Sequence, residues 1–179
     1  MSLDFKLGYV RKSTPIDAIL LAKWWSDGRV MAHAGFPNGL KTDINALKKR
    51  LEEEDPLFVL WIIENESHQA IGEMSYRIKD STATIGIKIC ELSEQGKGMG
   101  PKALKAFINY LFEVQKVHKI ILDTMIENTR AQKVYRSLKF TQTAINPNIW
   151  QDQLGTWRTS VDFVLTKETY EENKAFYHE

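Results

Sequence analysis

The stretch Gln95–Gly100, QGKGMG, places three glycines and a lysine between a segment typical of a strand and one typical of a helix. Glycine loses more conformational entropy on ordering than any other residue, so this density indicates unusual dihedrals or close approach by another molecule. A glycine-rich loop that opens a helix points backbone N–H groups outward at the positive end of the helix dipole, which suits phosphate. The spacing matches neither the Gly-x-Gly-x-x-Gly of dinucleotide folds nor the Gly-Lys-Ser/Thr of triphosphate sites. A flexible connection is the alternative reading.

The apolar pattern around this loop alternates between strand and helix periods. Strands are predicted at 5–12, 57–64, 70–78, 82–89, 118–125, 140–145 and 159–166, and helices at 13–25, 42–54, 101–116 and 128–140. We expect Thr14 and Thr42 to cap the first two helices. The first helix should bury one face, made by Ile16, Ile19, Leu20 and Trp24. The order β-α-α-β-β-β-α-β-α-β-β predicts an α/β fold, a mixed sheet with helices on its faces.

Composition narrows the class of protein. The chain has 179 residues and no Pro/Gly/Ser-rich linker, which predicts one domain over 1–179. A net charge of +1, dispersed along the chain, argues against a nucleic-acid partner. The single cysteine, Cys90, rules out an internal disulfide framework, and the four histidines lack metal-ligand spacing, so we expect no metal. No secretory segment or membrane span is evident, which predicts a cytoplasmic protein.

Two segments together resemble a known family. Gln95–Gly100 after a strand, with ENTRAQKVYRSLKF at 127–140, resembles the signatures Gln/Arg-x-x-Gly-x-Gly/Ala and Asn-x-x-Ala-x-x-x-Tyr-x-x-x-x-Phe of the GNAT family of acetyl-CoA-dependent N-acetyltransferases. The resemblance covers about residues 5–168, leaves 169–179 as a C-terminal tail, and implies a mostly antiparallel sheet of about seven strands flanked by about four helices. Lys139 stands where the family usually has glycine, which leaves the local turn in question.

The resemblance implies acetyl-CoA as cosubstrate and assigns its contacts. The glycine loop would bind the pyrophosphate, with Lys97 adding charge, and the backbone of 89–91 would pair with the pantetheine arm. Asn128 would hydrogen-bond that arm, or simply cap its helix. The implied cofactor-binding residues are Ile89, Cys90, Glu91, Gln95, Gly96, Lys97, Gly98, Met99, Gly100 and Asn128.

The resemblance also marks catalytic candidates. Tyr135 occupies the position of the general acid that protonates the departing thiolate, although periodicity alone makes it a core aromatic. Glu91 and Asp123 are candidates for the base that removes the amine proton, directly or through water. Their alternative roles are a solvated loop charge and a strand-end hydrogen-bonding group. An oxyanion donor is expected at the backbone N–H near Ile89.

The sequence constrains the identity of the acetyl acceptor least. The segment 24–40 offers Trp25, Arg29, His33 and Phe36 as an acceptor wall, or as ordinary packing. This segment and 155–166 are similar to the GNAT sub-group that includes ribosomal-protein N-terminal acetyltransferases and some antibiotic-amine acetyltransferases. We expect a protein N-terminus as acceptor. A small-molecule amine, antibiotic or polyamine, and a non-catalytic acyl-CoA-binding module are the alternatives, and a homodimer is left open.

Overall fold

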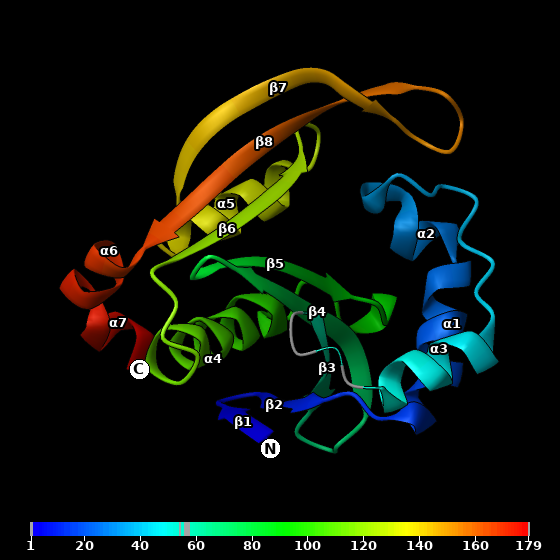
Figure 1. Ribbon diagram of the computed structural model, residues 1–179, viewed down its shortest axis with the longest axis horizontal. Coiled ribbons are helices and arrows are strands. Elements are labelled where there is room, and N and C mark those ends of the chain that lie inside the picture. Colours follow the sequence, from blue (N-terminus) through cyan, green and yellow to red (C-terminus); the bar gives the residue numbers. More distant parts are fainter. Residues whose placement is uncertain (1, 54, 56–57, 179) are drawn as a thin grey trace.

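One sheet of eight strands organises the molecule (Figure 1). The computed structural model describes residues 2–53, 55 and 58–178. The sheet order is β1-β2-β3-β4-β5-β6-β8-β7, and all neighbours are antiparallel except β5 and β6. The strands are β1 Ser2–Phe5, β2 Gly8–Lys12, β3 Phe58–Asn65, β4 Ala70–Lys79, β5 Thr82–Ile89, β6 Lys119–Met125, β7 Thr141–Gln151 and β8 Trp157–Thr166. The predicted mixed, mostly antiparallel sheet is confirmed. Its eighth strand arises because the segment 5–12, expected as one strand, belongs to the β1–β2 hairpin.

The four predicted helices are present, and the described part of the chain also contains three short ones. The helices are α1 Ala18–Ser26, α2 Gly28–Met31, α3 Ile44–Glu52, α4 Met99–Glu113, α5 Thr129–Ser137, α6 Lys167–Glu172 and α7 Lys174–His178. Short 3₁₀ turns occupy Pro15–Asp17, Ala32–Ala34 and Leu92–Glu94. The segment expected as a C-terminal tail forms most of α6 and all of α7, and it packs inward because Tyr170 and Tyr177 are buried.

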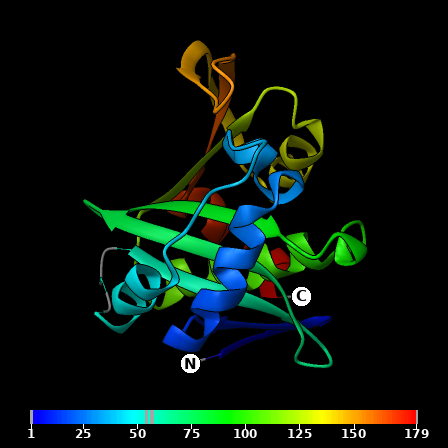
Figure 2. The same cartoon turned by 90° about the vertical axis from the view of Figure 1, so that its right-hand side faces the viewer.

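Helices cover both faces of the sheet and enclose two apolar clusters. Helices α1 and α3 lie on one face, and α4 lies on the other with α7 beside it (Figure 2). The large apolar residues that recur every three or four positions along α4 are all buried: Leu104, Phe107, Ile108, Leu111 and Phe112. Their spacing of three and four residues gives a continuous apolar stripe, which drives α4 onto the sheet.

The predicted buried face of the first helix is right for Trp24, which is buried, and for Leu20, which is half-buried, but wrong for Ile16 and Ile19. Ile16 and Ile19 are 85% and 59% exposed, whereas the buried side chains are Ala18, Leu21, Ala22 and Trp24. The cause lies in the first turn, which is 3₁₀ and advances three residues per turn instead of 3.6. Asp17 is drawn toward the sheet by Arg11, whose two guanidinium nitrogens lie 2.8 Å from its carboxylate oxygens. That ion pair ties the start of the helix to β2.

Two predicted helix starts also shift. Asp43 caps α3 by accepting hydrogen bonds from the backbone of Asn45 and Ala46, in place of the predicted Thr42. Helix α4 begins at Met99, two residues before the proline that the sequence suggested as its start. Its N-cap is Gly98, so the glycine loop and the helix are continuous.

The sheet divides where β5 meets β6. Among the described residues, these two strands pair over three positions, from Thr82 with Lys119 to Thr84 with Ile121. Beyond this point β5 continues beside β4, and β6 continues beside β8. The strands therefore separate toward the carboxyl end of β5, where the glycine loop begins.

Candidate active site

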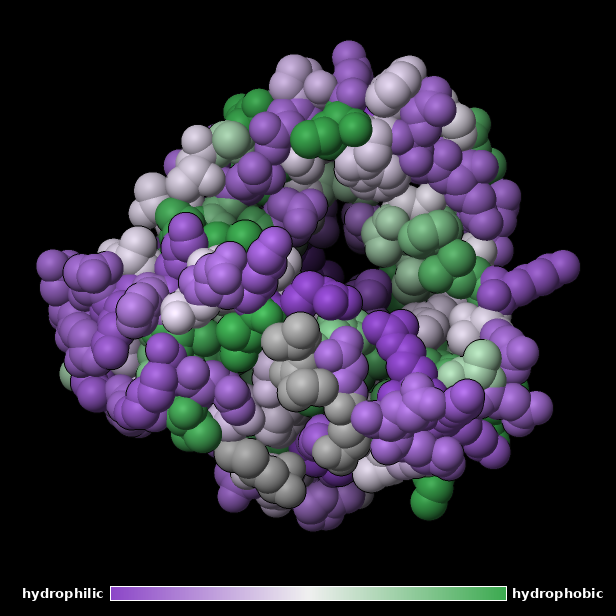
Figure 3. All heavy atoms as spheres, in the orientation of Figure 1, coloured by the Kyte–Doolittle hydropathy of each residue, from purple (hydrophilic) through white to green (hydrophobic). Residues whose placement is uncertain are grey.

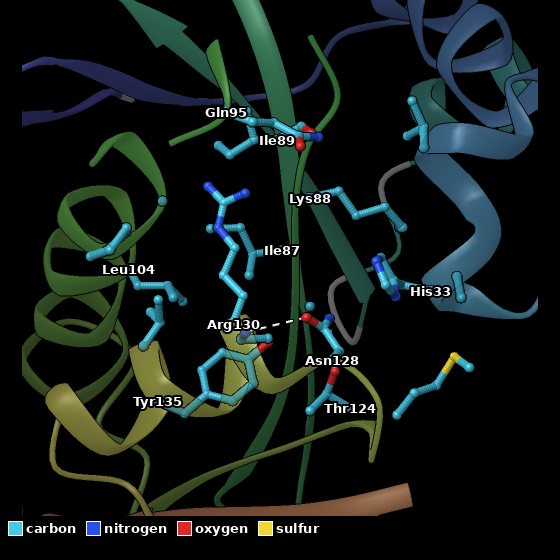
Figure 4. Close-up of a pocket in the computed structure, with 18 of the residues that line it drawn as sticks. His33, Ile87, Lys88, Ile89, Gln95, Leu104, Thr124, Asn128, Arg130 and Tyr135 are labelled. Atoms are coloured by element: carbon cyan, nitrogen blue, oxygen red, sulfur yellow. Dashed lines mark hydrogen bonds between the residues drawn. The ribbon is translucent and has the colours of Figure 1, made fainter. Parts of the chain in front are cut away.

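A cavity of about 860 Å³ occupies the opening between β5 and β6. One side is lined by α4, represented by Leu104, and by the glycine loop. The other side is lined by Val30 and His33, which belong to the opposite layer. Figure 4 shows His33 across the cavity from Leu104. Because its walls come from both layers, the cavity passes through the sheet where the two strands separate.

The glycine loop borders this cavity with the geometry of an anion site. Gly96 and Gly98 have φ of 84° and 80°, in the left-handed region that disfavours other residues. The Gln95 side chain donates to the carbonyl of Ile89 at 2.9 Å, which ties the loop to β5. A Cβ on Gly98 would meet no atom within 4 Å, and one on Gly100 would lie 3.8 Å from Ile89. The loop thus leaves open space at the start of the 15-residue α4, where helix N–H groups attract negative charge.

The positive charge beside this loop comes from Arg130, which sequence reasoning missed. Lys97 does not line the main cavity, because it turns away to pair with Glu94 at 3.0 Å. Arg130 extends from the start of α5 toward Ile89 (Figure 4), and its Nη2 lies 3.9 Å from where a Cβ on Gly96 would sit. No ion-pair or hydrogen-bond partner for Arg130 occurs among the described residues. Its place in the second signature segment was the available signal.

The edge of β5 offers part of the backbone surface expected for the cofactor arm. Cys90 and Glu91 both donate their N–H groups to the carbonyl of Ile71 on β4, at 2.8 and 3.0 Å, so neither N–H is free for a ligand. Backbone groups alternate in direction along a strand, so those of Ile89 and Ile87 face away from β4, toward the opening. The Ile87 and Ile89 side chains line the cavity. The backbone N–H groups that face the opening are therefore those of Ile87 and Ile89, so within the expected range 89–91 only Ile89 offers one.

The side chain of Glu91 forms a hydrogen bond outside the cavity. Its carboxylate accepts a hydrogen bond of 2.7 Å from the Trp24 indole, and it is not among the cavity-lining residues. The contact holds the end of α1 against the end of β5. This geometry favours a structural role for Glu91, in place of both the catalytic role and the solvated loop charge that was its alternative.

Tyr135 is both a core aromatic and a cavity residue. Its ring packs against Phe140 and Phe163, with centroid separations of 6.1 and 5.5 Å, and 7% of the residue remains exposed. Tyr135 lines the cavity, and no hydrogen-bond partner for its hydroxyl occurs among the described residues. Burial, together with the charge of Asp123, raises the pKa of Tyr135 to about 12. The phenol is therefore fully protonated at neutral pH.

Asp123 lies on β6, directly opposite Asp162 of β8, and lines the cavity. Although it is accessible from the cavity, desolvation raises the pKa of Asp123 above its ordinary value, and the charge of Asp162 raises it further. A carboxylate with a raised pKa is a stronger base than a solvated one. Asp123 therefore has the electrostatic character expected of a proton acceptor.

Asn128 acts as a helix cap. Its side-chain oxygen accepts from the Ala131 N–H at 3.2 Å, and its amide donates to the Thr124 hydroxyl at 3.1 Å. Asn128 also lines the cavity. At the other end of α5, Lys139 adopts a φ of 66°, so the turn keeps the left-handed conformation that glycine favours despite the larger side chain.

Two of the four residues expected to line the acceptor side of the cavity do so. Arg29 and His33 line it, whereas Trp25 and Phe36 pack in the cluster under α1 and α3. The indole of Trp25 donates to Glu73 at 3.0 Å. Residues that the sequence did not single out complete the wall, namely Lys88, Trp150 and Ser160. The position of Lys88 could have been predicted from the alternation of its strand. The positions of Trp150 and Ser160, on β7 and β8, depend on contacts between segments that are distant in sequence.

Two further properties concern the described residues. They contain no group of three or more His, Cys, Asp or Glu side chains arranged to hold a metal ion. No helix among them is long and apolar enough to cross a membrane.

Comparisons with known proteins agree with this geometry. The family model described as an acetyltransferase (GNAT) domain matches residues 9–141. The fold is similar to that of RimL, a ribosomal L7/L12 α-N-protein acetyltransferase solved with coenzyme A, with a TM-score of 0.82, 14% identity, and coverage of 94% of this chain and 99% of that one. No curated protein sequence matches significantly.

Two other solved structures have the same fold. A spermidine N-acetyltransferase from Vibrio cholerae, in complex with CoA and spermine, aligns with a TM-score of 0.81 and 17% identity, covering 90% of this chain and 96% of that one. The ribosomal-protein-S5-alanine acetyltransferase from Vibrio fischeri aligns with a TM-score of 0.77 and 21% identity, covering 94% and 97%. At these identities the likeness establishes the fold, and the family follows from the match to its model over most of the sequence. The chain belongs to the GNAT acetyltransferase family.

Proposed function

We propose that this protein transfers an acetyl group from acetyl-CoA to a primary amine by direct attack within a ternary complex. The observation that carries the proposal is the cavity through the divided sheet. It joins a glycine loop whose geometry suits an anion on one side to polar side chains on the other, with Tyr135 and Asp123 in its lining. Two reactants entering from opposite faces would meet at the gap between β5 and β6.

The cofactor side fits coenzyme A in shape and charge. The glycine loop and the start of α4 would hold the pyrophosphate, and Arg130 would neutralise part of its charge. The outward-facing backbone of Ile87 and Ile89 would pair with the amides of the pantetheine arm in the manner of an added strand. When bound, acetyl-CoA supplies the thioester carbonyl that the amine attacks.

The reaction moves two protons. A carbon–nitrogen bond forms, the carbon–sulfur bond breaks, one proton leaves the amine, and one reaches the sulfur. The phenol of Tyr135 holds a proton throughout the neutral range, which suits it to the sulfur. Because its pKa is raised to about 12, it gives up that proton only to an acceptor that is itself poorly solvated. A thiolate inside the same cavity meets this condition.

Asp123 is the group that we assign to the amine proton. It lines the cavity, and its raised pKa increases its basicity. A backbone N–H of β5 at Ile87 or Ile89 would donate to the carbonyl oxygen as negative charge develops there. Glu91 has no place in this scheme because its carboxylate is bonded to Trp24 outside the cavity.

The acceptor that we propose is a protein N-terminus. An α-amine has a pKa of about 7.7–8.0 and is partly neutral at pH 7, whereas a lysine-like amine at about 10.4 is almost wholly protonated. The carboxylates that line the described cavity are Glu94, which is paired with Lys97, and Asp123. The cations on the acceptor side, Arg29 and Lys88, are themselves paired, with Asp27 and Glu73 at 2.6 Å each. Because Asp123 is the lining carboxylate that has no ion-pair partner among the described residues, an acceptor with one amine of low pKa fits better than a polycation.

The test is a panel of acceptors incubated with labelled acetyl-CoA, with coenzyme A release followed over time and products identified by mass. The panel contains peptides with free N-termini, the same peptides with blocked N-termini, polyamines and aminoglycosides. We expect acetylation of the free peptides and no product from the blocked ones. Selective acetylation of a polyamine would overturn the choice of acceptor. Thermal stabilisation by acetyl-CoA without turnover on any amine would show a binding module instead of an enzyme.

A further inference from the structure

Asp123 has a second carboxylate directly beside it. In the antiparallel register of β6 and β8, Asp123 is the direct partner of Asp162. Side chains of directly opposed residues project from the same face of a sheet, with Cβ atoms about 4.5–5.5 Å apart. The pKa of Asp123 reflects this arrangement, because desolvation raises it and the charge of Asp162 raises it further. The two side chains therefore form a pair of like charges next to the cavity.

Asp162 is the member of the pair that the fold supplies with hydrogen-bond donors. Its Oδ2 accepts a hydrogen bond of 2.8 Å from the side-chain amide of Asn146, and its Oδ1 accepts a longer one, of 3.4 Å, from the hydroxyl of Ser160. Asn146 also donates to the Ser160 hydroxyl at 3.1 Å, so the three side chains form one network on β7 and β8. Both donors are neutral, and no cation pairs with Asp162 among the described residues. The network holds the carboxylate in place without cancelling its charge.

Asp123 is the member of the pair that opens to the cavity. It lines the cavity, whereas Asp162 is not among the lining residues. In the described part of the chain no other residue bonds the Asp123 carboxylate, which accepts from its own backbone N–H. Figure 3 shows the hollow beneath the β7–β8 hairpin, where hydrophilic residues gather. An amine in this cavity would therefore meet Asp123, and Asp162 would act on it only from the side.

The other charged and titratable groups that line the cavity leave this pair to itself. Three of them form ion pairs of their own: Arg29 with Asp27, Lys88 with Glu73, and Glu94 with Lys97. Of the remaining three, Arg130 extends toward Ile89, and His33 lies on the opposite layer (Figure 4). The third is Tyr135, whose pKa burial and then the charge of Asp123 raise to about 12, so it is neutral at pH 7. The charge of Asp162 thus acts on Asp123 without a cation between them.

We propose that Asp162 is a positioning residue for the transfer reaction: its charge, held beside Asp123 by Asn146 and Ser160, increases the affinity of Asp123 for the proton of the attacking amine. In that step an N–H bond of the amine breaks and an O–H bond forms on Asp123. A pair with two negative charges becomes a pair with one, and the relief of repulsion favours the transfer. Loss of the proton to water restores the pair. This inference rests on the proposed function and adds a residue to the same site.

The experiment compares wild type with Asp162→Asn, which keeps the size of the side chain and an oxygen for Asn146 but removes the charge. Asp162→Thr is a second uncharged variant, with a side chain that suits a strand. The matched control is Asp80→Asn, at an exposed aspartate in the β4–β5 turn, away from the carboxyl end of β5 where the cavity lies. The titration of Asp123 is followed by carboxyl-carbon NMR without cofactor or amine, and its resonance is assigned from its loss in Asp123→Asn.

In both Asp162 variants we expect Asp123 to titrate about one pH unit lower than in wild type, because a like charge has been removed. Asp80→Asn should titrate as wild type. The second readout is kcat/KM for a free N-terminal peptide as a function of pH, given as the ratio of variant to wild type so that ionisation of the peptide amine cancels. This ratio should be about one third at neutral pH, because the base is weaker, and should rise as pH falls, because Asp123 stays ionised to lower pH in the variant.

Three results would overturn the inference. The first is a wild-type Asp123 that titrates at or below the ordinary carboxyl value, which needs no variant to detect. The second is an unmoved titration of Asp123 in a folded Asp162→Asn or Asp162→Thr protein. The third is a loss of single-turnover rate on Asp162→Asn that is as large in an Asp123→Asn background as in wild type, since Asp162 would then act by another route. A shifted titration without turnover on any amine would support the carboxylate pair and refute the proposed function.

Discussion

Replacement of Gly100 by alanine separates the two roles that a glycine can have in this loop. Gly100 lies in the first turn of α4 and has ordinary helical backbone, unlike Gly96 and Gly98. A Cβ there would lie 3.8 and 3.9 Å from the side chains of Ile89 and Ile87, which are ordinary contacts. The protein can therefore accept the methyl group without rearrangement. The added methyl instead takes space from the cavity, which Gly100 lines.

The expected effects on stability and binding have opposite signs. Without ligand, alanine should raise the free energy of unfolding by up to about 1 kcal/mol, because it is the better helix former. At a hundredfold excess of acetyl-CoA over the wild-type dissociation constant, wild type gains about 2.7 kcal/mol. If Gly100→Ala weakens binding tenfold, the gain at the same concentration falls to about 1.4 kcal/mol.

Denaturant unfolding with and without acetyl-CoA measures both quantities on one protein. Gly98→Ala is the contrasting variant, because its left-handed φ of 80° should make it lose stability even without ligand. NADH and ATP serve as control ligands and should not match acetyl-CoA. If Gly100→Ala gained the full 2.7 kcal/mol that wild type is expected to gain, the phosphate would not lie against this turn, and the cofactor assignment would fail.

Three further predictions concern charge and backbone conformation. Arg130→Gln should weaken acetyl-CoA binding by about tenfold, because one charge-assisted contact is lost, whereas Lys97→Gln should bind as wild type. Calorimetry measures both affinities, and the reverse result would mean that Lys97 and not Arg130 contacts the phosphate. Asp123→Asn should lower turnover yet leave thermal stability equal or higher. Because the pKa of Asp123 is raised in the folded protein, its contribution to stability is present below the ordinary carboxyl pKa and is lost as pH rises through the folded pKa. At neutral pH the ionised carboxylate therefore lowers the free energy of unfolding. Lower stability with full turnover in Asp123→Asn would contradict its role. Lys139→Gly should raise the free energy of unfolding by about 0.5–1 kcal/mol because the residue has a φ of 66°, and a melting temperature below that of wild type would contradict this reading.

The sequence predicted best where one local pattern decided the outcome. The strict alternation of Ile85, Ile87 and Ile89 gave the bounds of β5 as 82–89, as observed. The repeat of apolar residues in α4 gave its buried face. In both segments the period of the pattern and the packing against the sheet agree, so local reasoning was sufficient.

It failed where a specific side-chain contact, which the apolar pattern does not encode, overrides that pattern. The start of α1 is tied to β2 by the pair between Arg11 and Asp17, which periodicity does not reveal. Likewise, the loop lysine was expected at the phosphate, but only the fold shows Lys97 turning to Glu94 while Arg130 faces the glycines. Trp150 reaches the cavity through the hairpin, and no short-range signal marks it.

The central claim is that Tyr135 protonates the leaving sulfur in this cavity. Its hydroxyl has no partner among the described residues, so Tyr135→Phe keeps the packing against Phe140 and Phe163 and removes only the proton. The most direct measurement is the single-turnover rate of acetyl transfer to a free N-terminal peptide, with acetyl-CoA affinity determined on the same sample. We predict a rate about 10²-fold below wild type with nearly unchanged affinity. A wild-type rate in Tyr135→Phe would contradict the claim and leave Tyr135 as a core residue.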